Sequence, residues 1–558
     1  MKKLLTLIVT TILQSSFIIS YSLACTNIIV GKQASQDGSV LVTYSADNYG
    51  TYGSMYFHAG GTHAKGEMRP IYDGDTNRHW GEIPQAETTY RVIGQMNEHQ
   101  VSICETTFGG REELCDTTGI LDYTSLIYIA LERATTARQA INVMTSLVAQ
   151  YGYNSEGESF SVCDKNEAWI LEMIGKGPGV RGANWVAVRI PDDCISAHAN
   201  QSRITRFDLK DKQNVLYSKD IIKFARQKGY FTSKKDADFS FRDAFAPSDF
   251  SATRYCEARV WSIFNHFFTG MAPYTDYAFG LVPVTDPAAR YTEMPLYVKP
   301  DKPVNLQTVI AAMRDHYEDT PLDFRSQPGA GPYQMPYLPT PLSWELDGKK
   351  YFNERPVSTQ QASFCVVCQM HATLPNAVGG IVWFTNDDPN MAPFMPVFCG
   401  ATSVPKCYKR IPGEQDDLHY TTESAFWLQN TVSNYVYPYY SKIFPDLQQV
   451  RDSLEQAAIK ETSVFQLTAT PELTASEKYA KFLTDYSQQK ATDMMARWQQ
   501  LFRYIMVKHN DMAVRKLNPD GSFKQNPYGL AAPVDRPGYP EAYRRRIVKE
   551  TGDRYLIK

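Results

Sequence analysis

Short runs of β-branched and apolar residues, separated by turn-forming residues, fill most of the chain before residue 203. Such runs predict strands, and Gln36-Asp37-Gly38 predicts a turn between the first two. Between Ser125 and Tyr151, apolar residues instead recur at helical spacing, and Thr135-Thr136 interrupts them and can cap a second helix. The predicted strands span 26–31, 39–45, 91–95, 101–105, 160–163, 168–173 and 185–190.

The second part of the chain mixes helices with two further strands and ends in long amphipathic helices. Pro-rich residues 329–343 predict an irregular insertion, and 518–539, rich in Pro and Gly, predict an irregular surface segment. The change to long helices after Tyr408 predicts a domain at 25–408 and a helical segment at 409–558 that packs on it. The predicted helices span 218–229, 255–268, 305–317, 425–435, 447–460 and 476–508, and the strands span 362–370 and 380–385.

The first 24 residues carry the pattern of a secretory signal peptide. Two lysines precede an apolar run that ends at Ile19, and small residues stand at Ser22 and Ala24. We therefore expect cleavage before Cys25 and an exported protein, periplasmic or secreted. The run is too short and too rich in hydroxyl groups to span a membrane, and no second run is long enough, so no membrane span is expected in the mature chain. A lipobox would prefer Leu where Ser22 stands, which makes a lipid anchor on Cys25 the weaker alternative.

The chain has 558 residues, with 57 Lys and Arg against 60 Asp and Glu and a formal net charge of −3. This balance, without a long run of like charge, argues against nucleic acid as a partner. Ten cysteines fit an oxidising compartment, where some form disulfides and others stay buried thiols. Cys365 and Cys368 resemble half of a zinc site, but Cys399 and Cys407 are spaced too far apart to complete it. Familiar metal and nucleotide motifs are missing from the sequence, so neither a metal nor a cofactor is expected.

Cleavage at the predicted site would make Cys25 the first residue of the mature chain. A cysteine in this position can act as a nucleophile without a histidine, because its own α-amine, with an ordinary pKa of about 7.7–8.0, can accept the thiol proton. If the first two predicted strands pair as a hairpin, Cys25 faces Ser45. Asp47 then lies two residues further on the same face, within reach of the α-amine.

Six short segments follow one another in an order shared with a known enzyme family. They are Ala24 to Gly31, Ala46-Asp47, Asn97 to His99, Glu167 to Glu172, Trp185 to Arg189 and Ile195 to Ile204. Together they resemble peptidase family C69, cysteine dipeptidases with an N-terminal nucleophile that are related to bile-acid and penicillin V acylases. The resemblance covers residues 25 to 408. It implies an α+β fold, the four-layer αββα sandwich of N-terminal-nucleophile hydrolases, followed by a helical C-terminal segment.

The resemblance implies a role for each matched residue. Cys25 matches the nucleophile and carries the base, and Asp47 matches the carboxylate that holds its α-amine. Asn200 matches the amide that donates to the oxyanion, a donor whose loss costs about 10²–10³ in rate. Thr107 stands where acylase relatives have a second such amide, and Arg254 resembles their active-site arginine.

Four further residues complete the expected site. Tyr44 stands where relatives often have an arginine three residues before the aspartate, so that positive charge has to come from elsewhere or is not supplied at all. His198 would share a strand face with the predicted amide; it is a second-choice base, and a structural role is the preferred interpretation. Glu105 and Glu172 are candidates for the group that binds the free amino terminus of a substrate.

The function implied is hydrolysis of the peptide bond of dipeptides by an exported cysteine dipeptidase. Two alternatives remain open. One is an amidase or acylase of conjugated small amides, of the bile-salt or penicillin V type, and the other is an exported binding protein or lipoprotein without turnover. The expected partner is a dipeptide or another small amide, and a homo-oligomer is left open.

Overall fold

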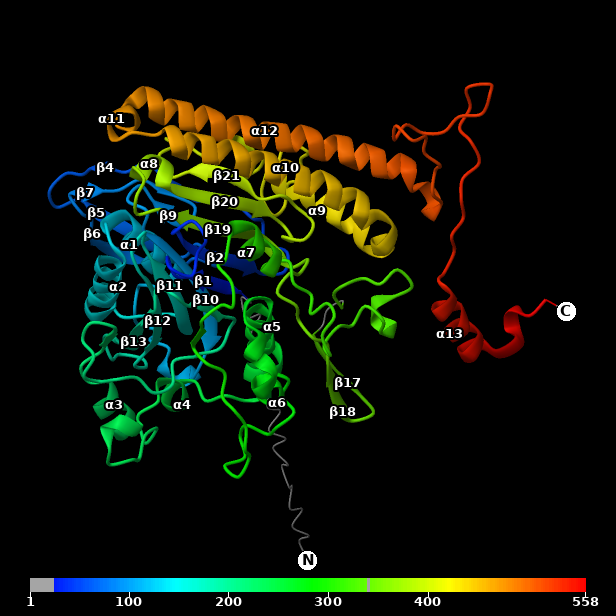
Figure 1. Ribbon diagram of the computed structural model, residues 1–558. Helices are drawn as coiled ribbons and strands as arrows, with labels where there is room; N and C mark the ends of the chain where they lie inside the picture. The colour runs from blue at the N-terminus through cyan, green and yellow to red at the C-terminus, as the bar shows by residue number, and fades with distance from the viewer. Residues whose placement is uncertain (1–24, 339–341, 558) are drawn as a thin grey trace, which may run out of the picture.

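Two large antiparallel sheets form the centre of the protein (Figure 1). The computed structural model describes residues 25–338 and 342–557, and the predicted signal peptide, residues 1–24, lies outside the described residues. The seven-stranded sheet has the order β16 Tyr297–Val298, β14 Ile195–His198, β1 Asn27–Val30, β2 Val40–Asp47, β19 Ala362–Met370, β20 Gly380–Asn386 and β21 Met395–Phe398. The eight-stranded sheet has the order β15 Val215–Tyr217, β13 Ala183–Ile190, β12 Ala168–Gly175, β11 Gly157–Cys163, β10 Ser102–Gly109, β9 Met96–Asn97, β8 Val92–Ile93 and β3 Phe57–His58.

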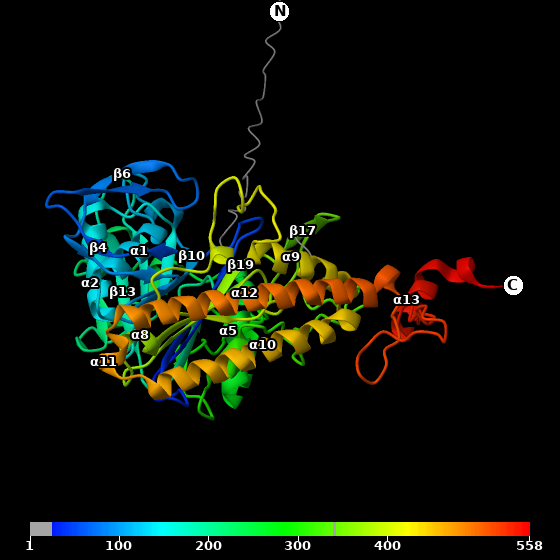
Figure 2. The same cartoon turned by 90° about the horizontal axis from the view of Figure 1, so that it is seen from above.

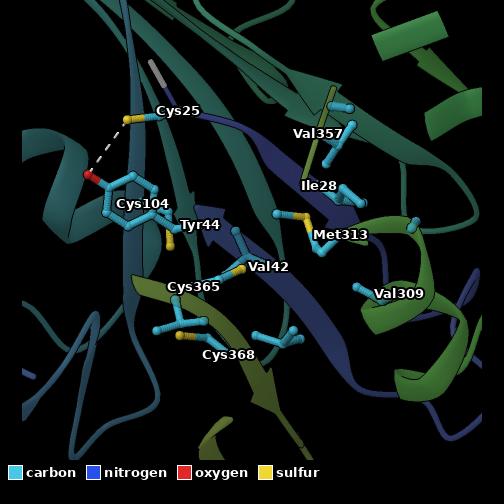
Figure 3. Packing of buried hydrophobic residues seen from close by; sticks show 14 of the residues in the cluster. Cys25, Ile28, Val42, Tyr44, Cys104, Val309, Met313, Val357, Cys365 and Cys368 are labelled. Carbon is cyan, nitrogen blue, oxygen red and sulfur yellow. Dashed lines mark hydrogen bonds between the residues drawn. The ribbon is translucent and has the colours of Figure 1, made fainter. Parts of the chain in front are cut away.

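The two sheets pack against each other, with β1 and β2 beside β10 and β11. Apolar side chains of both sheets belong to one large buried cluster. Cys104 and Cys368 lie close together between the two sheets, whereas Cys365, three residues earlier on β19, points to the other face (Figure 3). All ten cysteines of the described chain are free thiols and eight of them are buried, so the expected disulfides are not present there.

Helices α1, Tyr123–Arg133, and α2, Ala137–Tyr151, cover the outer face of the eight-stranded sheet (Figure 1). The helix break predicted at Thr135-Thr136 is confirmed, because the Thr136 side chain accepts a backbone hydrogen bond as the N-cap of α2. Buried aliphatic residues of these helices and of the strands below them form a second core.

Three long helices lie over the β20–β21 end of the other sheet (Figure 2): α9 Ala425–Val436, α10 Tyr440–Thr468 and α12 Glu477–Lys508. These three predicted helices are confirmed, although α10 extends beyond both ends of the predicted span 447–460. The helix predicted at 305–317 is shorter and ends at Ala312. The domain division at residue 408 stays a prediction. In the structure, helices that follow residue 408 cover a sheet whose strands all precede that residue.

Shorter helices cover the rest of that sheet face, with α5, Ala258–Phe267, against β14 and α7, Leu306–Ala312, against β19. A π-helical turn, Ala252–Glu257, leads directly into α5. Val309 and Met313 pack near the start of β1 (Figure 3). The architecture is mixed, with antiparallel sheets and a C-terminal helical region, and agrees with the predicted α+β class.

The segment from 91 to 105 forms two successive hairpins, whereas the two predicted strands, 91–95 and 101–105, would form one. Val92 pairs with Asn97, and Met96 pairs with both Ile93 and Ser102. The extra turn falls at Gly94, whose φ of 54° lies in the left-handed region that glycine adopts without strain.

The residues after α12 leave the sheets (Figures 1 and 2). Helix α13, Glu541–Thr551, has no buried residue. The predicted irregular segment 518–539 is confirmed, with isolated bridges such as the one between Gln525 and Ala531. Within the described ranges, no helix is both long and apolar enough to cross a membrane.

Candidate active site

Cys25 lies directly before β1, where the ends of two other strands meet it. Strand β1 runs between β14 and β2, and both are antiparallel to it, so their C-terminal ends lie beside its N-terminal end. Asp47 is the last residue of β2, and Asn200 follows β14 by two residues. The fold therefore brings the predicted nucleophile, carboxylate and amide to one end of one sheet.

The register of the first hairpin differs by one residue from the prediction. Ser45 pairs with Thr26 and not with Cys25, because a long loop joins the strands and does not fix the pairing as a tight turn would. A shift of one residue moves every side chain to the other face. Tyr44, and not Asp47, therefore shares a face with Cys25, and its hydroxyl lies 3.9 Å from the thiol sulfur (Figure 3).

Arg259 of α5 links the two strand ends. Its Nη1 donates to the Cys25 carbonyl at 2.8 Å and to the Thr26 hydroxyl at 2.7 Å. Its Nη2 donates to the Ala199 carbonyl and to the Asn200 side-chain oxygen, both at 3.0 Å. The side chain is buried, and its planar fork holds the nucleophile and the amide in a fixed relation.

Asn200 takes a backbone conformation that few side chains tolerate. Its φ is 63°, in the left-handed region where asparagine is enriched, and such residues concentrate at functional sites. Its Nδ2 donates to the Thr107 carbonyl at 2.8 Å, and its own carbonyl accepts a hydrogen bond from the Cys256 thiol at 3.3 Å. The amide group is therefore held on both sides, by Thr107 and by Arg259.

Asp47 is fully buried and paired. Its carboxylate accepts hydrogen bonds from the Ser45 hydroxyl and from the Arg355 guanidinium. Burial raises the pKa of Asp47 to about 6, although the charges of Arg355 and Arg259 and the bond from Ser45 oppose the rise. Above that pH the carboxyl is ionised.

The Cys25 thiol faces acidic and phenolic groups. Glu105 Oε1 accepts from the sulfur at 3.6 Å and also accepts a short hydrogen bond from the Tyr44 hydroxyl. Burial raises the pKa of the Cys25 thiol well above its ordinary value, and the charges of Glu105 and Asp47 raise it further. The thiol is therefore protonated at neutral pH.

Thr107 connects this group to a second carboxyl. Its hydroxyl donates to Glu158 Oε1 at 2.6 Å, while its carbonyl accepts from Asn200. The Thr107 side chain is thus engaged, and it supplies no amide at the position where the resemblance to acylases implied one.

A family model described as Peptidase family C69 matches residues 24–453. The chain belongs to this family. It is therefore a peptidase, and so a hydrolase. It is similar to a probable dipeptidase of Latilactobacillus sakei, 24% identical over 491 residues that cover 84% of this chain and 92% of the relative. A probable dipeptidase of Salmonella dublin is 26% identical over 400 residues (68% of this chain, 81% of the relative), and dipeptidase A of Lactobacillus helveticus is 24% identical over 429 residues (72% and 80%).

Arg254 of this peptidase has other partners than the resemblance implied. Its guanidinium donates to the Phe279 carbonyl at 3.0 Å and forms an ion pair with Glu354 at 2.7 Å. The arginine that contacts Cys25 is Arg259, five residues later, because the π-helical turn before α5 sets which side chains of this segment face the strand ends.

Glu172 and His198 are satisfied by groups outside the site. The Glu172 carboxylate accepts hydrogen bonds from the Ser202 hydroxyl and from two backbone N–H groups, which favours a structural role. The His198 ring is hydrogen-bonded on both nitrogens, to Thr106 and Ser161, each at 2.7 Å. Burial lowers the pKa of His198 to about 3, so the ring is neutral and supports the structural interpretation over that of a base.

Sequence reasoning missed Arg259, Arg355 and Glu158. Arg259 could have been noticed, because it is a charged residue directly before the mostly apolar segment Val260–Phe264. Glu158 similarly stands two residues before the predicted strand 160–163 and lies within the observed strand β11. Arg355 lies in an irregular stretch, where no periodicity marks a buried residue.

Two cavities flank the site. One of about 470 Å³ is lined by Asn200, Cys256 and Phe108 among others, and one of about 440 Å³ is lined by Arg355 and residues next to Asp47. Cys25 borders neither of them among the described residues. The described part of the chain contains no group of three or more His, Cys, Asp or Glu side chains arranged to hold a metal ion.

Proposed function

We propose that this peptidase is a cysteine dipeptidase whose nucleophile is the Cys25 thiol. The names of its relatives support the substrate class. The observation that carries the proposal is the convergence of Cys25, Asp47 and Asn200 at the ends of three neighbouring strands, with Arg259 between them. A thiol, an amide donor and a carboxylate in such an arrangement can perform acyl transfer.

In the proposed reaction, removal of residues 1–24 frees the Cys25 α-amine, which accepts the thiol proton as the sulfur attacks the substrate carbonyl carbon. Asn200 donates to the oxyanion of the tetrahedral intermediate. The protonated amine gives its proton to the leaving amino group as the C–N bond breaks, which leaves a thioester on Cys25. Water, deprotonated by the same amine, hydrolyses the thioester and releases the first residue of the substrate.

The raised pKa of the Cys25 thiol supports a mechanism in which a base removes the proton during attack, because little thiolate is present beforehand. The α-amine, with an ordinary pKa of about 7.7–8.0, suits that task near neutral pH. Asp47 is ionised at neutral pH and can hold the protonated amine. The positive charge expected near Tyr44 would come from Arg259 and Arg355 instead.

We also infer that the fold is the αββα sandwich of N-terminal-nucleophile hydrolases. Two antiparallel sheets that pack together, with α1 and α2 over one outer face and α5, α7, α10 and α12 over the other, support this assignment. So does the position of Cys25 at the start of an interior strand of its sheet.

The proposal includes export. Residues 1–24 act as a signal peptide that delivers the enzyme to the periplasm or the medium, and cleavage creates the catalytic amine. Intact mass and N-terminal sequencing of the native protein should find an unmodified Cys25 as the first residue. A diacylglyceryl adduct on Cys25 would support the lipoprotein alternative, and an active chain that keeps residues 1–24 would contradict the mechanism.

The sharpest test compares a chain that begins at Cys25 with one that begins Met-Ala-Cys25, where the amine is tied up in an amide. The first should hydrolyse dipeptides and the second should not; equal rates would overturn the N-terminal-nucleophile mechanism.

Iodoacetamide should inactivate the enzyme with one label on Cys25, and activity should survive EDTA. Loss on chelation that zinc restores would contradict the assignment.

A substrate panel separates the dipeptidase from an acylase. Free dipeptides should react faster than N-acetylated dipeptides, longer peptides and glycine-conjugated bile acids. Faster hydrolysis of the blocked or conjugated compounds would identify an amidase of conjugated amides.

A further inference from the structure

Two carboxylic side chains lie together beside Cys25. Glu105 is on β10 and Glu158 on β11, and because Thr107 pairs with Glu158, the two glutamates are diagonal neighbours on one face of the sheet. One Glu105 oxygen lies 3.6 Å from the Cys25 sulfur. Both side chains are fully buried.

The pair lacks a positive partner within residues 25–338 and 342–557. Glu105 Oε1 accepts from Tyr44 and Glu158 Oε1 from Thr107, but neither Oε2 accepts a hydrogen bond from any other described residue, and the nearest group for each is the other carboxyl. The two arginines of the site have other partners. Arg259 donates to the Cys25 and Ala199 carbonyls, and Arg355 pairs with Asp47.

The two carboxyls hold a proton unequally. Burial raises the pKa of both, and the charge of Glu105 raises the pKa of Glu158 well above its ordinary value. The hydrogen bond from Tyr44 favours the ionised form of Glu105. Glu105, the carboxyl beside the nucleophile, is therefore the member of the pair that ionises more readily.

We propose that Glu105 and Glu158 form the subsite that binds the α-ammonium group of the substrate's first residue, an inference that rests on the proposed function. A buried negative charge needs a positive or hydrogen-bonding partner, and the ammonium group of a free peptide supplies both. Glu105 receives the charge, and Glu158 fixes the Glu105 carboxylate through the hydrogen bond between the two carboxyls.

The distances suit this ligand. A carbonyl carbon poised for attack lies about 3–3.5 Å from the attacking atom. The α-nitrogen of the same residue is two bonds from that carbon, or roughly 2.5 Å, because the N–Cα and Cα–C bonds measure about 1.46 and 1.52 Å. An oxygen 3.6 Å from the sulfur can therefore accept from the ammonium while the sulfur faces the carbonyl. Cleavage then follows the first residue, and an N-acetyl group would replace the charge with a bulkier neutral amide.

Binding can be measured without turnover. A chain that begins at residue 25 and carries Cys25→Ala keeps the α-amine but has no nucleophile. By calorimetry it should bind L-alanyl-L-alanine about 100-fold more tightly than the N-acetylated dipeptide. Adding Glu105→Gln should remove most of that preference. Equal binding of both ligands by the Cys25→Ala chain, or a preference that survives Glu105→Gln, would overturn the subsite, whatever the outcome for the Cys25 mechanism.

Kinetics of the active enzyme distinguish the two glutamates. Glu105→Gln should lower kcat/KM for the free dipeptide about 100-fold, mainly through KM. Glu158→Gln, which removes a neutral hydrogen bond, should lower it about 10-fold. Glu105→Asp keeps the charge and should recover part of the loss. Glu82→Gln, an exposed carboxyl outside the site, is the matched control and should change nothing.

The ratio of rates on free and N-acetylated dipeptide gives a readout that does not depend on how much of a variant is folded. It should fall in Glu105→Gln and stay unchanged in Glu82→Gln. Alkylation of Cys25 by iodoacetamide, measured without substrate, should not slow in Glu105→Gln, because the Glu105 charge raises the thiol pKa. If Glu105→Gln slowed alkylation and lowered the rates on both substrates equally, Glu105 would act on the Cys25 thiol and not on the substrate, which would overturn the subsite.

Discussion

The two sides of Cys25 satisfy their polar groups in different ways. We call the side that contains Asn200, Arg259 and Arg355 the basic side. There, the Arg259 guanidinium donates to two backbone carbonyls and to the Asn200 side chain, and the Arg355 guanidinium donates to the Asp47 carboxylate. On the acidic side, defined by Tyr44, Glu105 and Glu158, two buried carboxylate oxygens have only each other.

This difference indicates that the two sides have different roles in the reaction. Fully hydrogen-bonded groups hold a fixed geometry, which a reaction that stabilises developing charge requires. Buried polar groups without partners are rare in native proteins, and each calls for an explanation such as a ligand. We infer that the basic side positions the nucleophile and the oxyanion donor, and that the acidic side is completed by the substrate. A free dipeptide fits both sides, because its attacked carbonyl would face the oxyanion donor and its neighbouring ammonium group would face the carboxyls.

The largest effect is expected on the basic side, from loss of the Asn200 amide. Asn200→Gly removes the donor while glycine tolerates the φ of 63°. We expect kcat to fall about 10²–10³-fold with little change in KM, because the donor acts on the transition state. Steady-state kinetics with a free dipeptide measure this. Asn77→Gly, an exposed position with a φ of 56°, is the control; a rise in KM alone for Asn200→Gly would move Asn200 to substrate binding.

The next effect is expected from Arg259→Lys, which keeps the charge but loses the planar fork. The Cys25 carbonyl and the Asn200 side chain would no longer be held by one group, and we expect kcat to fall about 10–100-fold. Combined with Asn200→Gly the loss should be less than additive, because both changes disturb the same donor. Arg254→Lys, on the same helical segment but bonded to Phe279 and Glu354, should change activity little. If Arg254→Lys were the more damaging change, the arginine assignment would reverse.

Much of the fold could be predicted from the pattern of apolar residues. Strand β19 and helices α2, α9 and α12 fall within a residue or a few of their predicted spans, because their apolar faces repeat over many residues. The hairpin register could not be predicted, because it depends on how the long loop between β1 and β2 folds.

The candidate site was predictable only where a strand end or a resemblance marked it. Cys25, Asp47 and Asn200 were found in this way. Arg259 lies 234 residues from Cys25 and Arg355 lies 308 residues from Asp47 in sequence, and their contacts arise from packing between distant segments. Local periodicity contains no information on such contacts.

A pH effect should separate Asp47 from the histidines. Burial raises the pKa of Asp47 from 3.8 to about 6, so the carboxylate that holds the α-amine is lost as pH falls through about 6. We expect kcat/KM to show an acid limb there, which Asp47→Asn removes together with about 10-fold in rate at neutral pH. His198→Gln should leave the limb in place, because burial keeps the pKa of His198 at about 3. A limb that disappears in His198→Gln would contradict this assignment.

The same ionisation has a consequence for stability. A carboxyl whose folded-state pKa is raised stabilises the fold most when protonated, so its contribution is full below about pH 3.8 and is lost as pH rises through about 6. Asp47→Asn should therefore flatten the change in Tm between these values. Thermal unfolding across that range, with both proteins in the same buffers, measures it; an unchanged slope would mean that Asp47 titrates normally.

The smallest effect is expected from Tyr44→Phe, which alters the acidic side alone. The lost hydroxyl donates to Glu105 and lies 3.9 Å from the Cys25 sulfur. Its hydrogen bond lowers the pKa of Glu105, so without it Glu105 is protonated up to a higher pH and binds an ammonium less well. We expect KM for a free dipeptide to rise about 3- to 10-fold, more at pH 6 than at pH 8, with kcat nearly unchanged. Tyr56→Phe, which removes a similar bond to Glu132 outside the site, is the control. A fall in kcat at constant KM would instead place the Tyr44 hydroxyl in the chemical step and remove the distinction between the two sides.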